Sequence, residues 1–410
     1  MSRVFTLQRF RTFTPEIHLV LMGTFFVRMA YFMVWPFLAV ILYRNFQLSA
    51  TTIGLMLTCA SLLGAAAGLL SGYYSDRTGR RRVILAGCAL GALAFFALAA
   101  AGHPVTYLLA IAGVSVGNAL LESTSKALIG DKIADRKDRE LAFYVRYFMI
   151  NAGAAVGALI GVWVGLSGKQ WAFGVTGGVY VAYWLMLVAW LRDGTPRAAQ
   201  AQRVKPGFGQ ACAQVFMDRV FLMLLLSNIA MAFVYANFDS TLVQYLTRSH
   251  APQLMAMIST LVAVNAATVI FGQFPILRLM ESLPPRQRIV IGVLLMCVSQ
   301  ALFAVSPVTS LIGFVLATFV LSVGELIAFP TFSVEVDRNT PDHLRGTYFG
   351  ASNLYSLGTA IAPLLGGLSL DIFGGRLLYL GLAVLCAVVA HLNRDTVASA
   401  SLRGAGKGQE

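Results

Sequence analysis

The chain has 410 residues, of which 58% are hydrophobic and only 12% are charged, and its formal net charge at pH 7 is +13. The charged share is about half that of a soluble globular protein, so too few polar residues are present to cover soluble domains of this size. The same numbers exclude disordered, fibrous and disulfide-scaffold proteins. Twelve membrane helices of about 20 residues need roughly 240 apolar residues, which is close to the supply here. The composition therefore predicts an all-α, polytopic membrane protein.

Twelve apolar runs follow a short basic amino-terminal segment. The first run, residues 18–43, is too long for a removable signal peptide, so we expect it to remain as the first span. The predicted spans are residues 18–43, 50–73, 82–101, 104–129, 140–166, 171–191, 219–247, 253–280, 287–306, 308–334, 344–370 and 376–393. Because the number of spans is even, both termini are expected on the same side of the membrane.

The distribution of lysine and arginine sets the expected orientation. Of the 31 basic residues, 24 fall on the side of the two termini, four on the opposite side and three within spans. Loops rich in lysine and arginine stay in the cytoplasm, so both termini are predicted to be cytoplasmic in a bacterial inner membrane. The positive net charge is thereby explained by topology, and no nucleic-acid partner is expected.

The longest polar interruption, Arg192–Asp218, separates six predicted spans from six. The expected organisation is an N-terminal bundle (residues 1–195), a cytoplasmic central loop (196–214), a C-terminal bundle (215–396) and a cytoplasmic tail (397–410). The halves resemble each other, since the glycine-rich stretch Gly153–Gly161 has a counterpart in Gly358–Gly367. Two pseudo-symmetric six-helix bundles are typical of secondary transporters and weigh against a channel made from one asymmetric bundle.

A short motif lies between predicted spans 2 and 3. It reads Gly72-Tyr-Tyr-Ser-Asp76-Arg77-Thr-Gly79-Arg80-Arg81, which matches the cytoplasmic signature G-x-x-x-D-R-x-G-R-R of the major facilitator superfamily. A basic loop with a capping glycine would explain the arginines but not Gly72, Asp76 and Gly79 at these spacings. On these residues the chain is identified as a member of that superfamily. The resemblance implies a cytoplasmic gate in which Asp76 faces a helix amino-terminus and the arginines contact carboxylates.

Within the superfamily, the chain resembles the twelve-span drug:proton antiporters over its whole length. Their span-5 pattern, G-x-x-x-G-P-x-x-G-G, is matched at Gly153, Gly157 and Gly161, although Ala158 replaces the proline. A closer match lies in span 11, around Pro363. The arginine typical of span 4 is missing. Small residues four apart let helices approach closely, so the glycine motif has a packing explanation as well as a functional one.

Apart from those at the span ends, six charged side chains lie within the predicted spans, where each charge costs about 2.5–3.5 kcal/mol at the bilayer centre. They are Arg28 in span 1, Glu122 and Lys126 in span 4, Arg146 in span 5, Asp239 in span 7 and Glu325 in span 10. In the superfamily, spans 1, 4, 7 and 10 line the central cavity, so the resemblance places five of the six around water. These six are the candidate proton-coupling or substrate-cavity residues.

Each candidate also has a structural interpretation. Glu122 and Lys126 are four residues apart, which is the spacing of an ion pair within a helix. Arg146 could instead close the cytoplasmic gate against Asp131 or Asp135. These alternatives stay open at the level of sequence.

The carboxylates of spans 7 and 10 have no cation within a helical turn in the sequence. Asp239 and Glu325 could therefore take up and release a proton or bind a cation. The alternative is a salt bridge with Arg28 or Arg146.

These patterns predict a secondary active transporter rather than an enzyme. We expect a monomeric, proton-coupled exporter of a small amphipathic molecule, such as a drug or a siderophore, that works by alternating access. The alternative is a proton-linked importer of a sugar, peptide or organic anion, with Arg28 and Arg146 binding an anionic group. No ATP-binding loop, catalytic pair or metal-ligand spacing occurs in the sequence. No catalytic residue, metal or cofactor is therefore expected.

Overall fold

The structure, a computed structural model, describes residues 4–35, 38–48, 50–164, 170–192 and 206–405. All regular elements in these ranges are helices, and eleven of them are long and apolar enough to cross a membrane. The last of the eleven, Asp342–Arg394, contains the final two predicted spans. Gly374 separates these spans with a φ of 77°, outside the helical region. The predicted all-α fold with twelve spans is thus confirmed.

Contacts divide the chain into two compact units, each described here by itself. The N-terminal unit contains Thr6–Met217 and Thr340–Leu354. The C-terminal unit contains Met1–Phe5, Asp218–Asn339 and Tyr355–Glu410. In the sequence, residues 340–354 lie between and within spans of the second half. In the structure they pack with the N-terminal unit. Part of the predicted central loop (196–214) lies outside the described residues, and the rest includes a helix, α10.

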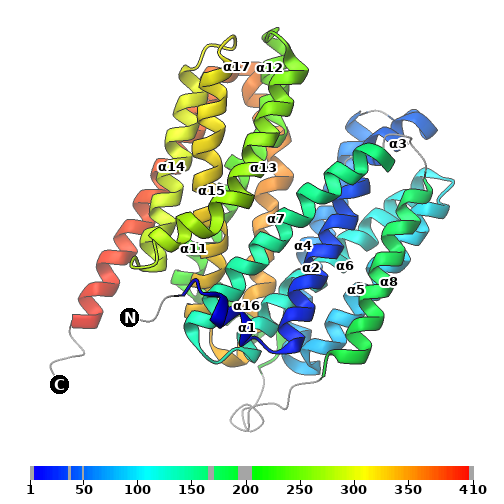
Figure 1. Ribbon diagram of the computed structural model, residues 1–410, viewed down its shortest axis with the longest axis vertical. Helices are drawn as coiled ribbons and strands as arrows, with labels where there is room; N and C mark the ends of the chain where they lie inside the picture. Colours follow the sequence, from blue (N-terminus) through cyan, green and yellow to red (C-terminus); the bar gives the residue numbers. More distant parts are fainter. Residues whose placement is uncertain (1–3, 36–37, 49, 165–169, 193–205, 406–410) are drawn as a thin grey trace. The chain divides into compact units, whose positions relative to one another are not determined.

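The N-terminal unit is a bundle of six long helices with shorter helices around it (Figure 1). Its elements are α1 (Leu7–Arg11), α2 (Pro15–Val34), α3 (Leu38–Phe46), α4 (Ala50–Thr78), α5 (Arg80–Ala100), α6 (Pro104–Lys132), α7 (Arg136–Val164), α8 (Trp171–Trp190), α10 (Phe208–Met217), η2 (Asp342–Leu344) and α16 (Arg345–Ser352). Helix α2 packs on α7 and α8, and α6 packs on α4 and α5. Apolar residues from these helices form a continuous core.

The C-terminal unit repeats this arrangement. Its elements are α11 (Arg219–Asp239), α12 (Thr241–Arg248), α13 (Leu254–Leu279), α14 (Pro285–Val305), α15 (Leu311–Asn339) and α17 (Ser356–Ala405), and η3 (Asn353–Tyr355) begins at the boundary between the units. Helix α11 packs on α17, and α15 packs on α13 and α14. These pairs correspond in order to α2 with α7 and to α6 with α4 and α5. The sequence repeat is therefore also a repeat of packing.

Two predicted spans are interrupted. The first, residues 18–43, comprises α2, which ends at Val34, and α3, which begins at Leu38. The seventh, residues 219–247, comprises α11 and α12, which meet at Ser240. Apolar length predicts the extent of each span but not the position of a break within it.

Glycines allow the backbones of α7 and α2 to touch. A Cβ at Gly153 would lie 2.5 Å from the carbonyl oxygen of Phe25, and one at Gly157 would lie 2.1 Å from that of Met29. Gly161 is buried in the same helix. Because a Cβ cannot approach a backbone oxygen so closely, α7 must have glycine at the first two positions. The span-5 glycine motif therefore has a packing role here.

The same device recurs in the C-terminal unit. A Cβ at Gly358 of α17 would lie 2.1 Å from the carbonyl oxygen of Ile229 in α11. Helices α14 and α15 likewise meet at Gly292 and Gly324, where a Cβ on the second would lie 2.7 Å from the carbonyl oxygen of the first. Glycine positions therefore specify which helices pack at backbone distance in each half.

We expect Gly157→Ala to destabilise the protein by about 1–3 kcal/mol, because the added methyl group overlaps a backbone oxygen that cannot move independently. Gly178→Ala in α8 is the matched control, since nothing lies within 4 Å of its Cβ position. The control should be neutral or slightly stabilising, because alanine favours helix over glycine. Thermal unfolding of the two purified variants in detergent measures the difference. Equal melting temperatures would contradict the packing role.

Candidate functional site

A cluster of four charged side chains lies inside the N-terminal unit. Glu122 of α6 is at its centre and accepts from three cations. Its Oε1 is 2.9 Å from Nζ of Lys126, and its Oε2 is 2.6 Å from Nη2 of Arg146 and 3.2 Å from Nη2 of Arg28. The ion pair expected between Glu122 and Lys126 thus forms. It is part of a larger cluster that joins α2, α6 and α7.

A cavity opens beside this cluster. Its volume is about 350 Å³ when the open solvent at its mouth is included. Charged, polar and apolar side chains share its wall. The lining residues are Gly23, Thr24, Val27, Arg28, Asn118, Leu121, Glu122, Ser125, Arg146 and Tyr183. Asn118 accepts a hydrogen bond from the Tyr180 hydroxyl at 2.8 Å. The cavity therefore combines two arginines and one carboxylate with neutral hydrogen-bonding groups.

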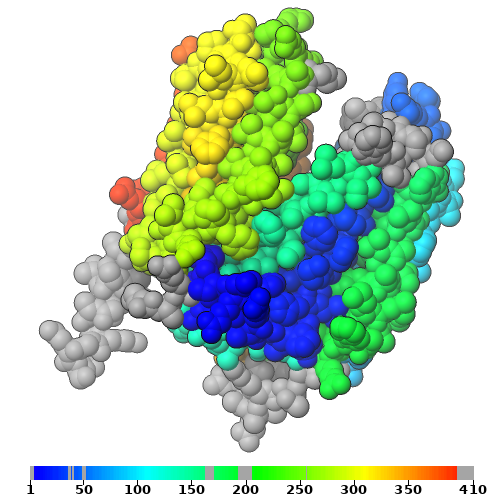
Figure 2. All heavy atoms as spheres, viewed as in Figure 1, coloured from blue at the N-terminus to red at the C-terminus, as the bar shows by residue number. Residues whose placement is uncertain are grey.

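The alternative that Arg146 contacts Asp131 or Asp135 does not describe this structure. Arg146 pairs with Glu122, whereas Asp131 binds Arg80 at 2.7 Å and Asp135 binds Arg9 at 3.0 Å. Asp135 also caps α7 by accepting hydrogen bonds from backbone N–H groups, chiefly that of Asp138. These hydrogen bonds, together with the contact to Arg9, lower the pKa of Asp135. Asp135 therefore stays ionised at neutral pH, and its carboxylate binds the N-terminal end of α7. Figure 2 shows the amino-terminal segment that carries Arg9 packed beside the first turns of α2.

The C-terminal unit contains a polar cluster of a different kind. Glu325 of α15 is 3% exposed, and its Oε2 accepts a hydrogen bond from Nδ2 of Asn265 at 2.9 Å. The same amide nitrogen lies 2.9 Å from the hydroxyl of Ser322. The Tyr235 hydroxyl lies 3.5 Å from the amide oxygen of Asn265. The cluster links α11, α13 and α15 around one carboxylate.

Sequence reasoning did not single out Asn265 as the partner of Glu325. Asn265 is an uncharged polar residue inside a long apolar run, and that isolation was the available signal. Which carboxylate it would bind could not be inferred, because 60 residues separate it from Glu325.

Asp239 lies apart from these contacts, at the last position of α11. Its side chain is exposed, and among the described residues it makes no hydrogen bond or ion pair. It is one helical turn beyond Tyr235, whose ring packs edge-on against Phe329.

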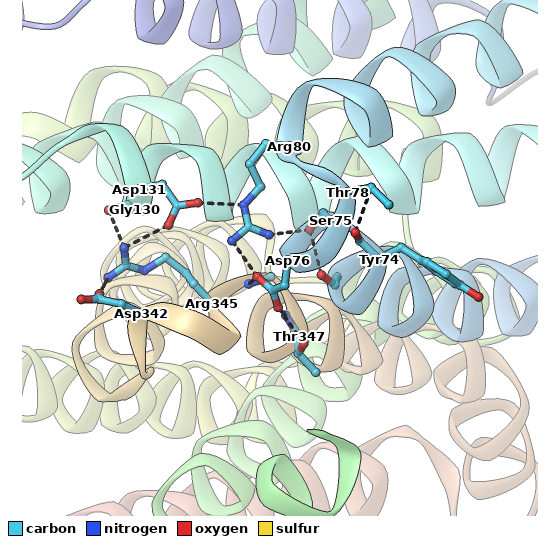
Figure 3. A network of polar contacts seen from close by, with 12 residues as sticks. Tyr74, Ser75, Asp76, Thr78, Arg80, Gly130, Asp131, Asp342, Arg345 and Thr347 are labelled. Atoms are coloured by element: carbon cyan, nitrogen blue, oxygen red, sulfur yellow. Dashed lines mark hydrogen bonds and ion pairs between the residues drawn. The ribbon is translucent and has the colours of Figure 1, made fainter. Parts of the chain in front are cut away.

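The glycine-aspartate-arginine motif forms a compact network within the N-terminal unit (Figure 3). The carboxylate of Asp76 accepts backbone N–H bonds from Gly346 at 2.9 Å and Thr347 at 2.8 Å, together with the Thr347 hydroxyl at 2.7 Å. These amides belong to the first turn of α16, where free N–H groups attract a negative charge. Arg80 pairs with Asp76 and Asp131, both at 2.7 Å. The motif thereby holds residues 340–354 in this unit.

The other motif residues have distinct roles. Gly79 ends α4 with a φ of 97°, which glycine adopts without strain. A Cβ at Gly72 would lie 2.1 Å from the carbonyl oxygen of Gly346. Arg77 donates to the carbonyl of Pro206 at 2.8 Å, and Arg81 donates to that of Val188 at 3.0 Å. These contacts join Arg77 and Arg81 to backbone carbonyls.

Comparison with known proteins gives the family. The model of the Major Facilitator Superfamily matches residues 20–356. The chain belongs to this superfamily. An uncharacterised transporter of the superfamily, YqjV from Bacillus subtilis, is 31% identical over 379 residues, which cover 91% of each chain. A Na⁺, Li⁺, K⁺/H⁺ antiporter from Planococcus maritimus is 26% identical, with 84% of this chain and 87% of that protein covered.

A solved structure agrees with the family. The human organic anion transporter MFSD10 is 18% identical and superimposes with a TM-score of 0.77, over 93% of this chain and all of that one. At this identity the likeness concerns the fold alone. The protein is therefore a multi-pass membrane transporter of the superfamily and not an enzyme.

We expect Asp76→Asn to loosen the first turn of α16, because the variant loses a charged acceptor of two backbone N–H groups. Hydrogen bonds to a charged group contribute about 1.5–3 kcal/mol, so the amides of Gly346 and Thr347 should exchange about tenfold faster or more. Hydrogen-exchange mass spectrometry of the purified protein measures this. Asp371→Asn, which removes an exposed carboxylate paired with Arg248, is the control. Unchanged exchange in the Asp76 variant would contradict the role of Asp76.

Proposed function

We propose that this transporter is a proton-coupled exporter of a small amphipathic molecule, and that Glu325 carries the coupling proton. The supporting observation is the environment of the Glu325 side chain. Glu325 is buried within the C-terminal unit and bound by the neutral amide of Asn265. A buried carboxylate is costly to keep charged, so gaining a proton is a favourable way to balance it. The exchange of protons for substrate would use this change of charge.

Glu122 is a poorer candidate for the same role. Lys126, Arg28 and Arg146 surround it within 3.2 Å and stabilise its negative charge. Protonating Glu122 would leave several cations uncompensated inside the bundle. Asp239, exposed and without an ion pair among the described residues, is proposed as a second proton-accepting group on α11.

The direction of transport and the orientation in the membrane are part of the proposal. Export is favoured by the resemblance of the sequence to drug:proton antiporters and by the similar protein that is named an antiporter of monovalent cations and protons. The drug or siderophore class of substrate follows from the same resemblance. We propose a monomer in a bacterial inner membrane with cytoplasmic termini, as the lysine and arginine distribution predicts.

We expect Glu325→Gln to abolish proton-driven transport, because glutamine cannot exchange a proton. Uptake of ethidium, an amphipathic cation, and of fluorescein, an amphipathic anion, is measured in inverted vesicles with an acidic lumen. The native protein should accumulate at least one of them, and the variant should retain only exchange down a gradient. The control is Asp371→Asn, which removes an exposed carboxylate of the same unit. This variant should transport as the native protein does. Undiminished proton-driven uptake in Glu325→Gln would refute the assignment.

The direction of transport has a separate test. Right-side-out vesicles with an acidic exterior should not accumulate the compound that inverted vesicles take up, because an exporter exchanges external protons for internal substrate. Accumulation in right-side-out vesicles, and none in inverted ones, would favour the importer alternative instead.

A further inference from the structure

The two oxygens of Glu122 have different partners. Oε1 is bound by Lys126 of the same helix at 2.9 Å. Oε2 is bound by Arg146 of α7 at 2.6 Å and by Arg28 of α2 at 3.2 Å. Displacing Oε2 from the two arginines would therefore leave Glu122 attached to Lys126.

The Arg146 guanidinium has an N–H donor that no described residue accepts. Its side chain lines the cavity and is buried, with the residue only 5% exposed, and its Nε–H has no hydrogen-bond partner among the described residues. A guanidinium carries five N–H donors in a rigid, planar fork that fits two oxygens of a carboxylate. A buried donor without a partner is costly, so this one would gain from an acceptor that a ligand brings into the cavity.

The charge of the cavity and the residues of its wall restrict the class of ligand that could bind there. The side chains of Arg28, Lys126, Arg146 and Glu122 carry a formal charge of +2 together. The wall also provides hydroxyl and amide groups as well as apolar patches at Val27 and Leu121. These features suit a small anion with an apolar body.

We propose that this cavity binds a small organic monoanion through its carboxylate, which replaces Oε2 of Glu122 on Arg146 and Arg28. Glu122 remains bound to Lys126 and acts as an internal competitor that occupies the arginines when no substrate is present. Because a neighbouring negative charge opposes a second one, Glu122 also weakens binding and so favours release. This inference names the substrate class of the exporter proposed above and rests on that function.

Binding of three compounds of equal size tests the site: benzoate, neutral benzamide and cationic benzamidine. Calorimetry on the purified full-length protein should give binding of benzoate and at least tenfold weaker binding of the other two. Arg146→Gln should weaken benzoate binding about tenfold or more, and Arg146→Lys should weaken it less, because lysine keeps the charge but loses the fork. Glu122→Gln should tighten it about tenfold, since the competing charge is removed.

The gain in Glu122→Gln cannot come from a misfolded protein, and it is the decisive result. Equal affinities in the native protein and Glu122→Gln, or equal binding of benzoate and benzamide, would overturn the proposal. Asp371→Asn serves as the control for loss of a carboxylate elsewhere and should leave the affinity unchanged. Benzoate should bind Glu325→Gln as it binds the native protein, so failure of proton coupling and failure of the anion site are observed separately.

Discussion

A carboxylate buried among apolar helices must have its charge balanced, and the ion cluster around Glu122 shows how this chain meets that requirement. Cations from α2, α6 and α7 lie within 3.2 Å of its two oxygens. Removing Glu122 would leave its three cations without this shared acceptor inside the bundle, which is costly. The cluster therefore joins three helices, and three of its charged side chains, Arg28, Glu122 and Arg146, also line the cavity. The contacts that join the helices thus include those that we propose a ligand would meet.

The two units have the same packing but different sites. Glycines at Gly153 and Gly157, and again at Gly358, bring corresponding helices to backbone contact. The polar residues between the helices are not repeated. One unit contains a cationic cluster around Glu122, and the other contains Glu325 bound by the amide of Asn265. On this duplicated scaffold we propose two chemistries, binding of an anion in one unit and exchange of a proton in the other.

The motif after α4 illustrates how a local pattern gains a partner from far along the chain. Asp76 binds the first amides of α16, 270 and 271 residues away. The free N–H groups of a helix start suit a carboxylate, so the type of partner followed from the motif, whereas its identity did not. The arginines were expected to contact carboxylates as a group. Arg80 does so, and Arg77 and Arg81 donate to backbone carbonyls.

Apolar length, loop charge and glycine spacing are local properties, and for this reason the sequence alone determined the number of spans, the duplicated six-helix plan and the superfamily. It also identified the charges that need a partner, because each of them stands out in an apolar run. Partners on other helices are not local: Arg28 meets Glu122 across 94 residues, and Asn265 meets Glu325 across 60. Only the tertiary structure decided those pairs and the packing of residues 340–354 with the N-terminal unit. Each of these depends on which helix faces which, and no stretch of sequence contains that information by itself.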